Sequence, residues 1–453
     1  MAMARLLKIF EPAPAIAPRS DPAEIAREYR YWRWRIFYSI YIGYVVYYFT
    51  RKSYTFAMPH MLKDLNLTMA ELGFLGTSLY LTYGVSKFVS GFLSDRANPR
   101  YFMAAGLIFT GIVNIFFGMS SSLLMFAVFW GLNGFFQGFG WPPCAKQLAY
   151  WSSAKERGLW YSAKATSHNV GGALIPVLIA LVCDRLGWRW SMYVPGCIGI
   201  AVGFWLINRL RDRPVSLGLP TIEAFHGEVE KEEVPVEGNG LKFIVWESVL
   251  KNKLIWLISL ANLFVYVLRT GINDWVALYL IKFKGFETLA ASSAVSWFEI
   301  GGFLGMFFAG WCSDTLFKGQ RLPIVIIASF ALFASVASFW LVPQHQHMLD
   351  YAAVFAIGFL IYIPQVLIGL AALESVDKTA ACTANGFTGL WAYIGAALAG
   401  YPIGKIIDIW GWSGFFVTMG ICAILTFLLL LPLWPQKKPV KMQDQTENAI
   451  ASA

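Results

Sequence analysis

Charged side chains are scarce in this chain, and their scarcity limits the class of protein that it can be. Asp, Glu, Lys and Arg make up only 14% of the 453 residues, against about a quarter in an average soluble domain. Hydrophobic residues reach 57% and recur along almost the whole length. A soluble chain of this size would usually divide into several domains. The composition instead predicts one polytopic domain in a lipid bilayer.

Cysteines, metal-ligand clusters and nucleotide motifs are also sparse or missing. The six cysteines are scattered through apolar stretches without a C-x-x-C pair, which is typical of packing residues rather than of disulfides or a metal site. The chain has no G-x-x-x-x-G-K-[ST] sequence, the motif that holds nucleotide phosphates. It also shows no nucleophile–base set, so we predict that the protein is not an enzyme and carries no cofactor.

The net charge of +9 does not require a nucleic-acid partner, because membrane proteins concentrate Lys and Arg on cytoplasmic loops. We therefore predict no nucleic-acid binding. The stretch before residue 36 lacks a continuous apolar region and does not fit a cleaved signal sequence. We interpret it as a cytoplasmic tail at the membrane surface.

Long apolar runs predict twelve membrane-crossing helices, six on either side of a polar segment. The expected spans are 36–57, 69–94, 101–119, 122–149, 157–183 and 189–209, then 252–281, 289–313, 322–342, 350–375, 379–408 and 412–434. The polar segment contains Pro, Gly and the acidic run EVEKEE, a composition typical of a linker. The predicted organisation is a tail (1–35), a bundle (36–209), a linker (210–251), a second bundle (252–434) and a tail (435–453).

The distribution of Lys and Arg predicts the orientation of these spans. If the spans alternate, most of the basic loop residues fall on one side: Arg27, Arg30, Arg33, Arg35, Arg96, Arg100, Lys155, Arg157, Arg209, Arg211, Arg213 and the PQKKPVKM tail. Both termini and the linker are then expected to be cytoplasmic. The exceptions on the opposite side are Arg185, Arg189, Lys282 and Lys284.

Two charged features recur at nearly the same separation in the two halves. Asp95 in GFLSDRANPR is matched by Asp314 in GWCSDTLFKGQR, and Arg51 is matched by Arg269. This repetition suggests two duplicated six-helix bundles, the arrangement of the major facilitator superfamily. Asp95, Arg96 and Asp314 are candidates for a cytoplasmic gate, since a carboxylate there can meet a helix N-terminus across the seam between the bundles. A tight turn without a gating role is the alternative.

Arg51 and Arg269 lie inside predicted spans, where charge is costly. A charge at the bilayer centre costs at least about 2.5–3.5 kcal/mol, and intramembrane ionisable residues are functional candidates by default. Snorkelling to the interface, or an ion pair with Asp274, is the structural alternative. Matching positions in both halves favour function. The planar guanidinium fork fits phosphate or carboxylate oxygens, so the pair predicts an anion site at the midplane.

Other polar residues in the spans extend this candidate site. Tyrosines near the two arginines on the same helix faces can offer hydroxyls to a phosphate or sugar: Tyr44, Tyr48 and Tyr266. Lys164 and His168 lie one turn apart, and Lys87 is either a ligand or an interfacial cation. Lys52, Asp274 and Glu299 are expected to balance charge and to hold the halves together.

Several stretches together resemble the organophosphate:phosphate antiporter family of the major facilitator superfamily, and within it the hexose-phosphate sensor-transporters. They are YYFTRKSYTFAMP, YGVSKFVSGFLSDRANPR, GFFQGFGWPPC, HNVGG, VYVLRTGINDW and NGFTGLWAYIG. The resemblance implies an all-α membrane protein with twelve transmembrane helices in two pseudo-symmetric bundles. It also implies that Arg51 and Arg269 bind phosphate, that His168 and Lys87 belong to the substrate pocket, and that pocket tyrosines include Tyr44, Tyr48, Tyr266, Tyr362 and Tyr393.

Two departures from the family pattern concern the rest of the substrate. Lys164 and Ala165 stand where the family has Trp-Asn before the histidine, so Lys164 is a candidate contact to a second phosphate oxygen or a sugar hydroxyl, with snorkelling as the alternative. The predicted eleventh span carries Asn385 and Thr388, whereas the dedicated hexose-phosphate carriers have an acidic and a basic residue there. Both departures bear on the sugar, not on the phosphate.

The leading hypothesis is exchange of a hexose 6-phosphate, with glucose 6-phosphate as the first choice, for inorganic phosphate by alternating access. The alternative is a receptor for external glucose 6-phosphate that signals to a membrane histidine kinase. Glycerol 3-phosphate is the alternative substrate, and a proton-coupled symporter for neutral sugars is disfavoured because paired cations suit an oxyanion. The expected setting is the lipid bilayer of a bacterial inner membrane, with the chain as a monomer.

Overall fold

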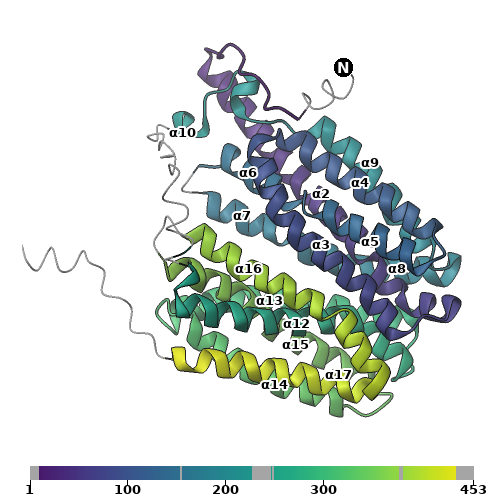
Figure 1. Cartoon of the computed structure of the whole chain (residues 1–453). Helices are drawn as coiled ribbons and strands as arrows, with labels where there is room; N and C mark the ends of the chain where they lie inside the picture. Colours follow the sequence, from purple (N-terminus) through teal and green to yellow (C-terminus); the bar gives the residue numbers. More distant parts are fainter. Residues whose placement is uncertain (1–9, 154–155, 227–245, 247–248, 377–380, 435–453) are drawn as a thin grey trace, which may run out of the picture.

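The computed structural model describes residues 10–153, 156–226, 246, 249–376 and 381–434, and in this part of the chain the regular structure is helical, without strands (Figure 1). The helices lie in two groups, with the purple-to-blue first half above the green-to-yellow second half in Figure 1. Among the described residues, nine segments are long and apolar enough to cross a membrane by length and mean hydropathy. The first two predicted spans are not among them. The first carries Arg51 and Lys52, and the second carries Glu71 and Lys87.

Helices fill the six spans predicted for the first half, of which the fourth and the fifth are each divided between two helices. The helices are α2 (Pro22–Leu65), α3 (Met69–Arg96), α4 (Pro99–Met119), α5 (Leu123–Gln137), α6 (Trp141–Trp151), α7 (Arg157–Ala165), α8 (Ser167–Leu186) and α9 (Trp190–Arg209). The fifth span is divided between α7 and α8. The fourth, 122–149, is divided between α5 and α6, where the sequence GFGWPP places two prolines in the first turn of α6. Proline at that position needs no backbone N–H donor and starts a helix.

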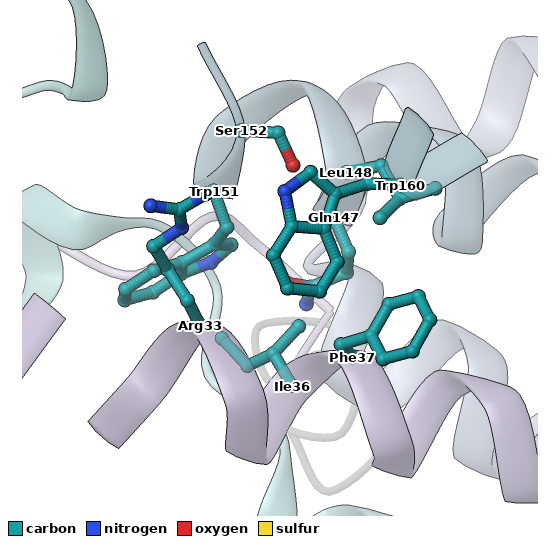
Figure 2. A pocket seen from close by; sticks show the side chains of 8 residues that line it. All are labelled: Arg33, Ile36, Phe37, Gln147, Leu148, Trp151, Ser152 and Trp160. Atoms are coloured by element: carbon teal, nitrogen blue, oxygen red, sulfur yellow. The ribbon is translucent and has the colours of Figure 1, made fainter. Parts of the chain in front are cut away.

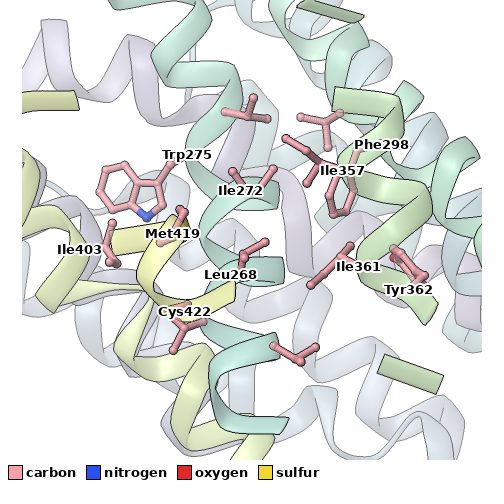
Figure 3. Close-up of a cluster of buried hydrophobic side chains, with 14 of the residues drawn as sticks. Leu268, Ile272, Trp275, Phe298, Ile357, Ile361, Tyr362, Ile403, Met419 and Cys422 are labelled. Carbon is pink, nitrogen blue, oxygen red and sulfur yellow. The ribbon is translucent and has the colours of Figure 1, made fainter. Parts of the chain in front are cut away.

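The second half contains six long helices that follow the predicted spans closely. They are α12 (Lys253–Lys282), α13 (Thr288–Thr315), α14 (Leu322–Leu341), α15 (His347–Glu374), α16 (Ala381–Leu398) and α17 (Tyr401–Leu430). Their core is apolar: Figure 3 shows Leu268, Ile272 and Trp275 of α12 among buried side chains that include Phe298 and Ile357. Close packing of such side chains, rather than their removal from water, fixes how each helix is rotated in its half.

The start of the chain is folded against the start of the predicted linker. Ala13 N donates to Asp212 Oδ2 over 2.7 Å, and Arg19 N donates to the carbonyl of Gly218 over 2.8 Å. The linker contributes the short helices η1 (Pro214–Leu217) and α10 (Ile222–Phe225) to this unit. Tail and linker, predicted as separate segments, thus form one packed layer at the end of the first half.

A small pocket lies beneath this layer, where α2, α6 and α7 meet. Figure 2 shows Arg33 and Trp160 among the side chains that line it. Its volume is about 10 Å³, which is room for about one water molecule. Arg33 is ion-paired with Glu156, which also accepts a hydrogen bond from Trp160 Nε1 over 3.3 Å. We interpret the pocket as a packing gap rather than a ligand site.

The two halves contact each other mainly at the end away from the tails. A side-chain methyl at Gly73 of α3 would overlap the carbonyl oxygen of Gly400, which precedes α17, so the two backbones touch there. Thr77 Oγ1 donates to the carbonyl of Ala397 over 2.7 Å and accepts from Tyr401 N over 2.8 Å. Small residues allow such close helix approach in membrane proteins.

Asp408 of α17 adds a second link at the same end. Its carboxylate accepts hydrogen bonds from Met69 N over 3.1 Å and from Ala70 N over 2.8 Å, the first backbone donors of α3. The carboxylate therefore caps a helix of the opposite half and faces the positive end of its dipole. All hydrogen bonds that join the halves within the described residues lie between the middle of the helices and this end.

Candidate substrate site

A cavity of about 250 Å³ lies between the two halves near the middle of the helices. Its lining comes from both halves: Tyr44, Tyr48, Arg51, Lys52, Tyr80, Tyr83, Lys87, Trp141, Ala165, His168, Tyr266, Arg269, Thr270, Asn273, Gln365, Tyr393 and Ala396. Four of these residues are Lys or Arg and six are Tyr, and the lining includes no carboxylate among the residues that the structure describes. The cavity is therefore electropositive and rich in hydroxyl groups, as an anion site requires.

Arg51 of α2 reaches the cavity without a carboxylate partner. Its Nε donates to Gln137 Oε1 over 3.3 Å. Its Cζ lies 4.3 Å from the ring centroid of Tyr83 and 4.9 Å from that of Tyr48. Aromatic faces attract a guanidinium but do not neutralise it, and no salt bridge to Arg51 occurs in the described part of the chain. Its charge is available to an anion in the cavity.

Arg269 of α12 brings the matching charge from the other half. Its Nη2 donates to the hydroxyl of Tyr362 over 3.0 Å, and its Cζ lies 5.0 Å from the Tyr362 ring centroid. Its Nε is buried and has no hydrogen-bond partner among the described residues. A buried guanidinium with an unused donor is costly, and a bound oxyanion would remove that cost.

His168 lies between the surroundings of the two arginines. Its ring centroid is 6.0 Å from that of Tyr48 and 6.1 Å from that of Tyr362, the rings that Arg51 and Arg269 contact. Its Nδ1 is hydrogen-bonded to the carbonyl of Ala165, so Nδ1 carries the proton. Its Nε2 has no partner in the described part of the chain. The unpaired nitrogen of this cavity-lining residue is free for a ligand.

Lys52 and Asp274 form an ion pair across the two halves. Lys52 Nζ of α2 lies 2.5 Å from Asp274 Oδ1 of α12 and 2.6 Å from Asn273 Oδ1. The hydroxyl of Tyr80 on α3 donates to Asp274 Oδ2 over 2.8 Å. Asp274 therefore pairs with Lys52, and Arg269 is left without it.

Glu299 of α13 extends this network through uncharged partners. Its carboxylate accepts from Asn273 Nδ2 over 2.9 Å, from Asn169 Nδ2 of α8 over 3.2 Å and from Tyr362 over 2.6 Å. The hydroxyl of Tyr362 also accepts from Arg269. A continuous chain of hydrogen bonds thus runs from Arg269 through Tyr362 to Glu299 and on to the opposite half.

Three of the sequence-predicted contacts do not line the cavity. Lys164 is buried behind it, with Nζ 3.5 Å from the Tyr44 ring centroid and 3.7 Å from the Trp141 ring centroid. Tyr362 is fully buried and accepts a hydrogen bond from Arg269. Asn385 is exposed and lies outside the lining. The other predicted contacts, including Lys87 beside Tyr393 at 4.9 Å from Nζ to the ring centroid, do line it.

The predicted cytoplasmic gate is described only in the second half. Asp314 pairs with Arg321, which also lies 3.0 Å from Glu374 Oε1, so Asp314 is held within its own half in this conformation. The side chains of Asp95 and Arg96 lie outside the described residues. A gating role for these residues stays a prediction.

The sequence analysis missed several polar groups of the site. Tyr80 and Tyr83 precede Lys87 by seven and four residues on α3, so the helical face that carries Lys87 could have indicated both. Asn169, Asn273 and Gln137 had no comparable signal. Uncharged amides are common in helix interfaces, and only their contacts show their involvement.

Two bundles of six spans, joined around a central polar cavity, define the chain as a membrane transport protein of the superfamily suggested by its repeat. The sequence model of the Major Facilitator Superfamily matches residues 40–400, so the chain belongs to that family. The fold class predicted from the sequence is confirmed, as is the expectation of a transporter rather than an enzyme. The chain is an integral, multi-pass membrane protein.

Two relatives are similar to this chain over nearly its whole length. The chain is 52% identical to a "Probable hexose phosphate transport protein" of Chlamydia trachomatis, over 94% of this chain and 96% of the relative. It is 48% identical to the "Membrane sensor protein UhpC" of Escherichia coli, over 95% and 99%. These relatives confirm the predicted resemblance to hexose-phosphate carriers and sensors.

Solved structures match the fold at low identity. A bacterial homologue of the human lysosomal transporter Spinster, in an inward-facing and occupied conformation, gives a TM-score of 0.70 at 14% identity, with 88% of this chain and 96% of that chain covered. At this identity the likeness concerns the fold alone.

Proposed function

We propose that this protein exchanges a hexose 6-phosphate, with glucose 6-phosphate as the first choice, for inorganic phosphate by alternating access. The observation that carries the proposal is that Arg51 and Arg269, one from each half, line one cavity that has no carboxylate in its described lining. The similarity to a probable hexose phosphate transport protein and to a membrane sensor protein supports an organophosphate substrate. Arginine suits this role because its planar fork can donate two parallel hydrogen bonds to a phosphate.

In the proposed cycle the phosphate group bridges Arg51 and Arg269 and draws the halves together. The cavity tyrosines and the free Nε2 of His168 then bind the remaining phosphate oxygens or sugar hydroxyls. Without an anion, closure would bury two like charges that have no counter-ion, which is strongly unfavourable. The empty carrier would therefore return slowly, and the protein would be an obligatory exchanger driven by the gradients of its two anions.

We place the tails and the linker in the cytoplasm of a bacterial cell, with the chain as a monomer in the inner membrane. This orientation follows from the basic loops on the tail side. The inter-half hydrogen bonds lie between the middle of the helices and the opposite end, so the conformation would be the inward-facing state. Two cations that contradict the pattern have structural partners: Lys284 pairs with Asp350 over 3.2 Å, and Arg189 donates to the carbonyl of Gly118 over 2.7 Å.

Uptake into proteoliposomes tests the exchange. Vesicles loaded with phosphate should take up labelled glucose 6-phosphate, and vesicles without phosphate should not. Arg51→Lys and Arg269→Lys should each abolish uptake, because a lysine keeps the charge and loses the fork. Arg185→Lys, at an exposed site on α8, is the matched control. Equal uptake into phosphate-free vesicles would refute the exchange.

A competition series identifies the substrate in the same vesicles. Unlabelled glucose 6-phosphate, glycerol 3-phosphate and phosphoenolpyruvate are compared for inhibition of phosphate self-exchange. We expect glucose 6-phosphate to compete best. Stronger competition by glycerol 3-phosphate would replace the hexose with the alternative substrate and leave the phosphate site unchanged.

A receptor for external glucose 6-phosphate is the second candidate function. The observation that favours it is the 48% identity to a membrane sensor protein. Such a receptor would use the same cavity and would signal through a membrane histidine kinase. Ligand-dependent activation of a co-reconstituted kinase, without measurable exchange, would favour the receptor. Robust exchange by the isolated protein would favour the carrier.

A further inference from the structure

Three arginines meet at the C-terminal end of α9, outside the cavity: Arg35 of α2, Arg100 of α4 and Arg211 of the segment that follows α9. Arg100 Nε donates to the carbonyl of Ile207 over 2.5 Å, and Arg35 Nη2 donates to that of Asn208 over 3.1 Å. Arg211 Nη1 also donates to Asn208 O, over 3.0 Å. We call Arg35, Arg100 and Arg211 the α9-end cluster.

The negative end of the α9 dipole offsets only part of the positive charge of the α9-end cluster. The C-terminal end of a helix carries about half a negative elementary charge, whereas the cluster brings three full positive charges. No carboxylate within the described residues forms a salt bridge with any of the three. The neighbouring Asp212 is buried and engaged elsewhere, since it accepts from Ala13 N and lies 3.7 Å from Arg213 Nε. A surplus of positive charge therefore remains.

The arginines of the cluster also repel one another. Partial burial, together with repulsion from Arg100 and Arg35, lowers the pKa of Arg211 below its usual value. Arg100 uses only its Nε and Arg211 only its Nη1 in hydrogen bonds among the described residues. Their remaining N–H groups are free to bind an anion with charge-assisted hydrogen bonds.

Aromatic side chains place the cluster at the depth of lipid headgroups. Arg35 and Arg211 both contact the Trp32 ring, with Cζ atoms 4.7 and 4.9 Å from its centroid. Tyr31 is 51% exposed next to Arg35, and Phe204 on α9 is 61% exposed. Exposed tyrosines close to basic residues are typical of the boundary between hydrocarbon and headgroups.

We propose that the α9-end cluster binds the headgroup phosphate of an anionic phospholipid. Tyr31 on α2 and Phe204 on α9 are exposed on the helices that meet at the cluster, which suits a ligand that has both acyl chains and a phosphate. Clusters of basic residues at the cytoplasmic surface of a membrane attract such headgroups through their charge. This binding is independent of transport and lies outside the cavity described above.

Native mass spectrometry of the full-length protein tests the site with defined lipids. The protein is purified in detergent and mixed with phosphatidylglycerol or with phosphatidylcholine. We expect phosphatidylglycerol to be retained more than phosphatidylcholine, and the Arg100→Gln/Arg211→Gln variant to bind phosphatidylglycerol at least roughly tenfold more weakly. A matched control, Arg185→Gln/Lys405→Gln, removes two exposed cations elsewhere and should retain it.

The Arg100→Lys/Arg211→Lys variant separates charge from folding, because it keeps both positive charges and should recover most of the binding. Unchanged retention in the Gln variant, or equal retention of phosphatidylcholine, would overturn the proposal. Addition of millimolar inorganic phosphate distinguishes the two sources of the anion. Displacement of the lipid from the wild-type protein at this concentration would assign the cluster to free phosphate and overturn the lipid assignment.

Discussion

Lys52 Nζ of α2 lies 2.5 Å from Asp274 Oδ1 of α12, across the two halves, and both side chains are about nine-tenths buried. Loss of one partner leaves a buried charge without compensation, which costs about 3–5 kcal/mol. We expect Asp274→Asn to lower the midpoint of thermal unfolding in detergent, and Lys52→Ala/Asp274→Ala to restore part of the loss. A double variant no more stable than Asp274→Asn would contradict a direct coupling between these side chains.

Asp408 is expected to hold the closed end of the molecule together. Asp408→Ala removes two hydrogen bonds to a charged acceptor, each worth about 1.5–3 kcal/mol, so the closed population should fall at least roughly tenfold. Spin labels at exposed positions 63 and 410, in a background without native cysteines, report the distance between the halves. Asp408→Asn keeps one acceptor oxygen and should give an intermediate result. Identical distance distributions in all three proteins would rule out this role.

Lys164 is expected to act on selectivity through its aromatic neighbours. Its ammonium group lies against the rings of Tyr44 and Trp141, both of which line the cavity, and a desolvated contact of this kind contributes about 2 kcal/mol. Lys164→Ala and the bulkier Lys164→Met should change competition among phosphorylated substrates more than they change phosphate self-exchange. Unchanged competition profiles would leave Lys164 with a purely structural role.

Lys284 and Asp350 form a fully buried pair remote from the cavity, with Lys284 Nζ also donating to the carbonyl of Val342 over 2.5 Å. Lys284→Met should lower stability by about 3–5 kcal/mol, since it leaves a buried carboxylate, and should leave substrate competition unchanged. Chemical unfolding in detergent and the competition series measure the two effects separately. A shift in selectivity without a loss of stability would refute this assignment.

The amino-acid sequence by itself determined which segments become helices and which spans carry charge. Apolar runs of the right length have one stable form in a bilayer, because every backbone donor and acceptor must be satisfied within the segment. Arg51 and Arg269 could be singled out at once because charges inside membrane spans are costly and rare. The family resemblance added Tyr362 and Tyr393 and placed His168 and Lys87 in the substrate pocket.

Only the tertiary structure decided what these side chains meet. Sequence spacing could not tell that Lys164 lies behind Tyr44 and Trp141, that Asn385 falls outside the cavity, or that Asp408 caps a helix of the other half. Such contacts depend on how each helix is rotated and how the halves cross, and those angles are set by packing between residues far apart in the chain.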